Sequence, residues 1–246
     1  MNHTRDRVAR ALLTAGAALL LGATEAPSAA PAALPETLSL TYGFTYGGMR
    51  IGTNTRTLTR ESDGRYHYRA RTRPQGMARM FTRVEWFEEG RFEIHDGRVR
   101  PLEHLKYRVG ASKPHRHSAS FDWAGQTVTY ADGRREPLPD NAQDASSMLY
   151  QLMLDPPRSA DTRQLMINNG KRFRVNEYRF LRRETLKTAF GPLDTLVVQW
   201  ATAVDTDDSE SLTAWLAVDK RNIPVRIVTL EDGKTAVMTL ESLAGL

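Results

Sequence analysis

Two histidines at short spacing are the first residues of this chain that could do chemistry. On a strand, His115 and His117 would share one face and could chelate a metal ion. Lys113, Pro114 and Arg116 surround them with positive charge and turn residues, and no nearby carboxylate completes a ligand set. We therefore expect a surface turn here and no metal site.

A second group combines carboxylates with hydroxyls, namely Asp140, Asp144, Ser146 and Ser147. A serine hydrolase would need a nucleophile elbow such as Gly-x-Ser-x-Gly, which is absent, and a histidine, which this segment lacks. The two serines fit the first turn of a helix, where hydroxyls beside an aspartate cap are structural. A hydrolase of an envelope polymer stays open as an alternative, with Asp140 or Asp144 as acid or base and a second carboxyl within roughly 5 to 10 Å. We predict no catalytic residue and no cofactor.

A third group is acidic. Asp205, Asp207, Asp208 and Glu210 could offer oxygen ligands to calcium. They lack the glycine and the spacing of a calcium-binding loop, so we interpret them as a solvated hairpin tip.

Methionines and aromatic residues crowd one segment that could line a ligand cavity. Met77, Met80, Phe81, Trp86 and Phe87 follow the breaker sequence Pro-Gln-Gly at 74–76. Flexible methionines beside aromatic rings can form an adaptable apolar lining for acyl chains or a hydrophobic peptide. Ordinary core packing is the alternative.

Arginines alternate with apolar residues just before that segment. Period two over 65–73 places Tyr66 and Tyr68 on one strand face, and Arg69 and Arg71 in a basic row on the other. The row could be a solvated outer face compensated by acidic neighbours such as Glu85, Glu88 and Glu89, or a surface that meets lipid headgroups, lipopolysaccharide or an acidic glycan. We take Arg69 and Arg71, with the five apolar residues above, as candidate ligand-binding residues.

Strands must position these groups. Residues 38–46 alternate apolar and polar, Gly47-Gly48 supplies a turn, and 49–60 continues as a hairpin partner. Turn dipeptides recur between strand-like runs, at Asp63-Gly64, Asp96-Gly97, Asp132-Gly133, Asn169-Gly170 and Asp232-Gly233. About a dozen strands in meander order predict a mainly β fold, a large antiparallel sheet curled into an open or half barrel.

One segment has helical spacing instead. From Asp144 to Leu154 the apolar residues recur at the period of an amphipathic helix, with Asp144 as N-cap and Pro156-Pro157 as a stop. We expect this helix to plug or cover the concave side of the sheet.

Residues 1–32 have the order of a secretory signal peptide. Basic residues precede an apolar run from Ala11 to Gly22, and a small-residue stretch follows. The apolar core is too short to span a bilayer, which needs roughly 20 residues. We expect cleavage after Ala32, which leaves one β-rich domain over 33–246 in the periplasm.

Composition narrows the function classes. The chain has no cysteine, which excludes disulfides, a cysteine nucleophile and the lipidated cysteine of a lipoprotein. Its formal net charge is only +5, which together with export argues against nucleic acid as a partner. We expect a monomer without a lipid anchor or membrane-spanning segment.

Several short motifs occur in an order that resembles a known family. They are Asp-Gly-Arg-Val-x-Pro at 96–101, Asp-Ala-Ser-Ser-x-x-Tyr-Gln at 144–151, Gly-Pro-Leu-Asp-Thr at 191–195, and Trp-Leu-Ala-Val-Asp at 215–219 before Ile-Pro-Val at 223–225. Their order is similar to that of the bacterial exported family called domain of unknown function 3108. The resemblance covers nearly all of residues 33–246 and implies an exported envelope protein with a β-rich fold and no established activity.

These observations predict a non-enzymatic cell-envelope protein that binds a hydrophobic or amphiphilic ligand, such as a lipid or lipopolysaccharide, or an envelope partner protein. Lipoprotein carriers of similar shape provide the analogy for ligand binding by such an open barrel. The hydrolase remains one alternative, and a module that receives a partner strand at an exposed β-edge is another.

Overall fold

Fifteen strands form one sheet in the computed structural model, which describes residues 33–158, 162–202, 211–231 and 233–246. The strands are β1 (Thr37–Tyr46), β2 (Met49–Arg60), β3 (Tyr66–Pro74), β4 (Glu85–His95), β5 (Arg98–Val109), β6 (Arg116–Asp122), β7 (Thr127–Tyr130), β8 (Arg135–Pro137), β9 (Ala142–Asp144), β10 (Arg163–Asn168), β11 (Phe173–Thr188), β12 (Gly191–Thr202), β13 (Ser211–Ala217), β14 (Ile223–Glu231) and β15 (Lys234–Ala244). The helices are α1 (Ala78–Phe81), α2 (Ser147–Leu154) and the 3-10 turn η1 (Val218–Lys220). No helix among these residues is long and apolar enough to cross a membrane.

The strand order consists of two meanders that meet at one seam. Strands β8 to β1 lie side by side in reverse chain order, and β15 to β9 continue the sheet beyond them. The seam is the antiparallel pair of β1 and β15. The predicted antiparallel sheet is therefore confirmed, with two differences. The sheet has more strands than the expected dozen, and β9 pairs with β10 in parallel.

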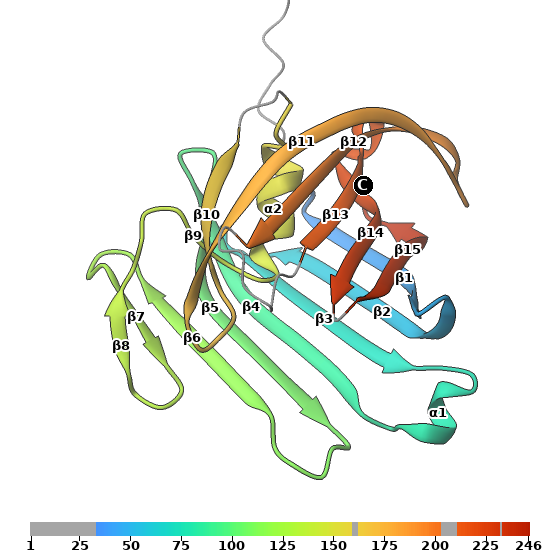
Figure 1. Ribbon diagram of the computed structural model, residues 1–246. Helices are drawn as coiled ribbons and strands as arrows, with labels where there is room; N and C mark the ends of the chain where they lie inside the picture. The colour runs from blue at the N-terminus through green and yellow to red at the C-terminus, as the bar shows by residue number, and fades with distance from the viewer. Residues whose placement is uncertain (1–32, 159–161, 203–210, 232) are drawn as a thin grey trace, which may run out of the picture. The chain divides into compact units, whose positions relative to one another are not determined.

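The sheet curls around α2 without closing into a continuous ladder (Figure 1). Its last strand, β9, reaches β5 through side chains. The Gln143 amide Nε2 donates to the Val99 carbonyl at 2.5 Å, and the Val99 N–H donates to Gln151 Oε1 at 2.8 Å. Side-chain hydrogen bonds thus bridge the gap in the half barrel.

Helix α2 fills the space between the two meanders, and six of its eight residues are buried. Tyr150 and Met153 pack into the cluster built by β1–β5 and β13–β15, where Tyr150 stacks on Phe92 at 5.2 Å. Met148 and Leu152 pack into the cluster built by β11–β14. The prediction that a helix covers the concave side of the sheet is confirmed.

The helix occupies one end of the concave side only. Asn222, in the β13–β14 turn, donates to the Met153 carbonyl at 2.9 Å, which fixes the end of α2 against that turn. We call this the α2 end of the sheet. At the opposite end of the strands lie the β1–β2 turn and the β3–β4 connection that carries α1, because Gly52 pairs with Pro74. We call this the α1 end.

The predicted turns fall between strands. Asp96 and Gly97 have φ angles of 50° and 72°, the positive pair that a two-residue hairpin turn requires. Asp232 and the expected acidic hairpin tip lie outside the described residues, as does the predicted signal peptide. One predicted boundary was wrong, because the helix expected from Asp144 begins at Ser147.

Candidate functional site

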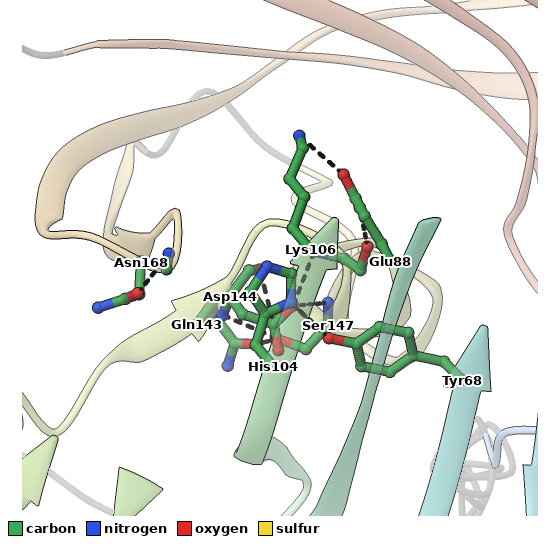
Figure 2. Close-up of polar contacts among 10 residues, drawn as sticks. Tyr68, Glu88, His104, Lys106, Gln143, Asp144, Ser147 and Asn168 are labelled. Carbon is green, nitrogen blue, oxygen red and sulfur yellow. Dashed lines mark hydrogen bonds and ion pairs between the residues drawn. The ribbon is translucent and has the colours of Figure 1, made fainter. Parts of the chain in front are cut away.

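A fully buried polar cluster lies beside α2. Tyr68 of β3, His104 of β5 and Asp144 of β9 meet there (Figure 2), and each side chain is almost completely inaccessible. The Tyr68 hydroxyl donates to Asp144 Oδ1 at 2.9 Å and lies 2.8 Å from His104 Nδ1. Burial and the Asp144 carboxylate raise the pKa of Tyr68 well above its ordinary value. Tyr68 therefore stays protonated and acts as a hydrogen-bond donor.

Asp144 also starts the helix. Its Oδ1 accepts the backbone N–H groups of Ser146 and Ser147, both at 2.8 Å. The predicted capping role is thus real, but Asp144 exerts it from two positions before the N-cap residue Ser146, whose own side chain caps nothing. Instead, the Ser146 hydroxyl donates to Glu88 Oε2 at 2.6 Å.

A partly buried ion pair continues the cluster toward the α1 end. Glu88 Oε1 lies 2.9 Å from Lys106 Nζ, and Figure 2 shows the two side chains meeting above the cluster. Burial raises the pKa of Glu88, but Lys106 and Arg56 outweigh this effect and hold the pKa well below its usual range. These contacts link β3, β4, β5 and α2, while Asp144 Oδ2 and His104 Nε2 are buried without a hydrogen-bond partner among the described residues. The arrangement is that of a structural clamp.

An open apolar pocket lies at the α1 end, with a volume of about 620 Å³. Its apolar lining includes Phe44, Met49, Ile51, Met77, Phe81 and Trp86. Phe44 follows the buried Leu40 and Tyr42 at period two, so it belongs to the concave face. Trp86 pairs with Thr72, which continues the face of Tyr68 and Ala70. The pocket is therefore the part of the concave side that α2 leaves free.

The pocket brings together three of the candidate ligand-binding residues. Met77, Phe81 and Trp86 line it, whereas Met80 points away from it and is 81% exposed. Arg73, not counted among the candidates, stands at its rim with Arg50.

The other three candidates lie on the outer face of the sheet. Arg69, Arg71 and Phe87 line a shallow hollow of about 520 Å³ there. The Arg71 guanidinium lies 5.4 Å above the Phe87 ring, and Phe87 stacks on Tyr107 at 5.0 Å. Arg71 and Arg69 form ion pairs with Glu85 and Glu89, as in the solvated and compensated outer face considered above.

The histidine pair also takes a different position from the surface turn that we expected. His115 and His117 are half-buried, with ring centroids 4.2 Å apart, and His115 packs edge-on against Trp86. Burial lowers the pKa of both. Arg108 adds to the effect on the pKa of His115, and Lys171 adds to the effect on both. No three metal-ligating side chains gather within the described parts of the chain.

Sequence reasoning missed the contributions of β1 and β2 to the pocket. Phe44 and Ile51 reach it because Phe44 pairs with Gly52, and Gly52 with Pro74. The period-two pattern of residues 38–46 places Phe44 on the face of Tyr42, and this signal could have found it. Tyr68 and His104 were missed as a pair because the register of β3, β4 and β5, which no local pattern specifies, places them on either side of Gly90.

Known proteins share this architecture. A family model described as "Protein of unknown function (DUF3108)" matches residues 41–241. The chain belongs to the DUF3108 family. This confirms the resemblance that the motifs carried. No curated protein matches the sequence significantly.

Solved structures similar to this DUF3108 chain share little of its sequence. The crystal structure of a beta-barrel-like protein of domain of unknown function DUF1849 from Brucella abortus has 10% identity and a TM-score of 0.55, covering 86% of this chain and 98% of that chain. Lipoprotein LppX from Mycobacterium tuberculosis also has 10% identity, with a TM-score of 0.30 over 85% of this chain and 86% of that one. The first likeness shows a shared fold, and the second is too distant to support a conclusion.

Proposed function

We propose that this DUF3108 protein is a non-enzymatic protein of the bacterial periplasm that holds a hydrophobic or amphiphilic envelope component in the α1-end pocket. The observation that carries the proposal is the pocket itself. Its volume lies within the roughly 300 to 1,000 Å³ of small-molecule sites, and its lining is apolar, with Arg50 and Arg73 at the rim. An acyl chain would fit the lining, and an anionic headgroup would fit Arg73, whereas Arg50 is already paired with Glu241.

The polar cluster gives the hydrolase alternative no support. Asp144 is 0% exposed, its Oδ1 accepts from Tyr68 and the first turn of α2, and its Oδ2 is buried without a hydrogen-bond partner among the described residues. A carboxylate in this position has no path to a polymer. Asp140 is exposed, but it lies outside the clamp.

The two edge strands of the sheet are poorly suited to pairing with a strand of a partner protein. Strand β8 has three residues and ends at Pro137, and β9 has three residues, all buried. Short, proline-bearing or covered edges are the features that block the pairing of a further strand.

Binding of a fluorescent fatty acid in vesicle-free solution tests the proposal. Ala78 lines the pocket from α1, so Ala78→Trp should fill it and weaken binding at least about tenfold, while Ala78→Ser should bind as the parent does. Equal melting temperatures of the two variants would exclude unfolding as the cause. Native mass spectrometry of protein purified from the periplasm supplies the second measurement. A protein that emerges without lipid and binds no fatty acid would refute the proposal.

A further inference from the structure

Exposed apolar side chains gather at one end of the molecule's sheet. The described residues include ten large apolar side chains that are exposed, and six of these lie at the α1 end: Met49, Met77, Met80, Phe81, Val109 and Leu230. Val109 belongs there because it pairs with Glu85, and Leu230 because it pairs with Thr235. Water is a poor environment for such a concentration of apolar surface, which marks it as an interaction site.

The centre of this surface is residues 75–84, which we call the α1 tip. Met80 is 81% exposed and Phe81 86%, and no residue of α1 is buried. A helix that buries nothing contributes little to the core. Core packing therefore does not explain the apolar residues of the tip.

Unpaired positive charge surrounds the tip. Residues 72–84 contain Arg73, Arg79 and Arg83 and no acidic residue. All three are exposed, and none forms an ion pair with another residue in the described part of the chain. They line a hollow of about 360 Å³ with Glu85, which is itself paired with Arg71. This hollow adjoins the rim of the apolar pocket, since Arg73 lines both.

We infer that the α1 tip docks on an anionic phospholipid bilayer. Met80 and Phe81 enter the boundary between headgroups and acyl chains, and the three arginines face the lipid phosphates. Exposed apolar residues beside cations are the combination that stabilises a protein at a negatively charged membrane surface. Docking in this way brings the pocket mouth to the bilayer. The inference concerns this surface and holds whether or not the pocket takes up a lipid.

The absence of cysteine makes a site-specific test straightforward. Met80→Cys can be labelled with an environment-sensitive NBD dye, and Phe190→Cys serves as the matched control. Phe190 is also partly exposed, but it lies in the β11–β12 turn at the opposite end of the strands. With vesicles of phosphatidylcholine and phosphatidylglycerol, the dye at residue 80 should brighten and shift to the blue, and the dye at residue 190 should not. Equal responses at both positions would overturn the inference.

Vesicle co-sedimentation of variants separates the two contributions. Met80→Ser combined with Phe81→Ser should lower the partition coefficient at least about tenfold. Arg79→Gln combined with Arg83→Gln should weaken binding to anionic vesicles by about tenfold or more and remove most of its salt dependence. No sedimentation of the parent protein with anionic vesicles, or equal sedimentation with phosphatidylcholine alone, would refute docking on an anionic surface. Fatty-acid binding without vesicles reports on the pocket separately, so the two proposals can fail independently.

Discussion

Glu88 is a partly buried carboxylate that the folded state keeps charged. Its side chain is only 18% exposed, yet Lys106 and Arg56 hold its pKa well below the usual range. The pKa of a glutamate in an unfolded chain is about 4.3. Between that value and the lower pKa of the folded state, the unfolded chain binds the extra proton. The stability that Glu88 contributes is therefore present above pH of about 4 and is lost as the pH falls toward the folded pKa.

Glu88→Gln should remove this dependence. We expect the parent to exceed the variant in free energy of unfolding at neutral pH, and the difference to shrink as the pH drops below about 4. Urea denaturation at stepped pH measures it. A difference that stays constant over this range would show that the charge of Glu88 is not coupled to folding.

Single residues also explain why only part of the site could be predicted. Neighbouring residues of a strand point to opposite faces, so Trp86 and Phe87 could never line one cavity. The same alternation separates Arg69 and Arg71 from the concave face of Tyr68 and Ala70. Met77 and Phe81 were found because one short connection carries them both. The residues missing from the prediction came from other strands, whose register no local pattern specifies.

Helix α2 depends on a carboxylate outside its own bounds. Asp144→Ala would leave the N–H groups of Ser146 and Ser147 without their acceptor and would remove one of the two partners of the Tyr68 hydroxyl. Buried donors without partners are costly, so we expect a loss of about 3 kcal/mol in the free energy of unfolding, measured by chemical denaturation. The exposed Asp140 supplies the control, because Asp140→Ala should change stability by no more than about 0.5 kcal/mol. Comparable losses in both variants would contradict the clamp.

The long elements were predictable and the short ones were not. Strands such as β1 have enough residues to show alternation, and paired turn residues mark their ends. Strand β9 has three residues, all buried, and pairs in parallel. Helix α1 has four residues and no buried face. Tertiary contacts decide such elements, and a segment this short shows no period of its own.

At the scale of the whole molecule, the two ends of the curled sheet have different roles. The α2 end is packed and clamped, and the α1 end holds the pocket and the exposed tip. Export would place this arrangement among the lipids of the envelope. The predicted cut after Ala32 precedes β1, which begins at Thr37, and would leave the seam strand intact.

Protein released by osmotic shock should therefore begin at Ala33 in N-terminal sequencing. Recovery of the chain in the cytoplasmic fraction with residues 1–32 still attached would contradict both the export and the cleavage prediction.

The seam between β1 and β15 also governs when the protein can fold. Strand β1 is the middle strand of the sheet, and of its two ladder partners β2 follows it directly, whereas β15 spans residues 234–244. The hydrogen bond from the Tyr42 hydroxyl to the Pro224 carbonyl likewise joins groups 182 residues apart in the chain. A nascent chain must therefore be synthesised almost through β15 before its central strand gains its second partner, and such long-range pairing is slow. If residues 1–32 direct export as predicted, this late completion of the sheet would leave the chain unfolded while it crosses the membrane.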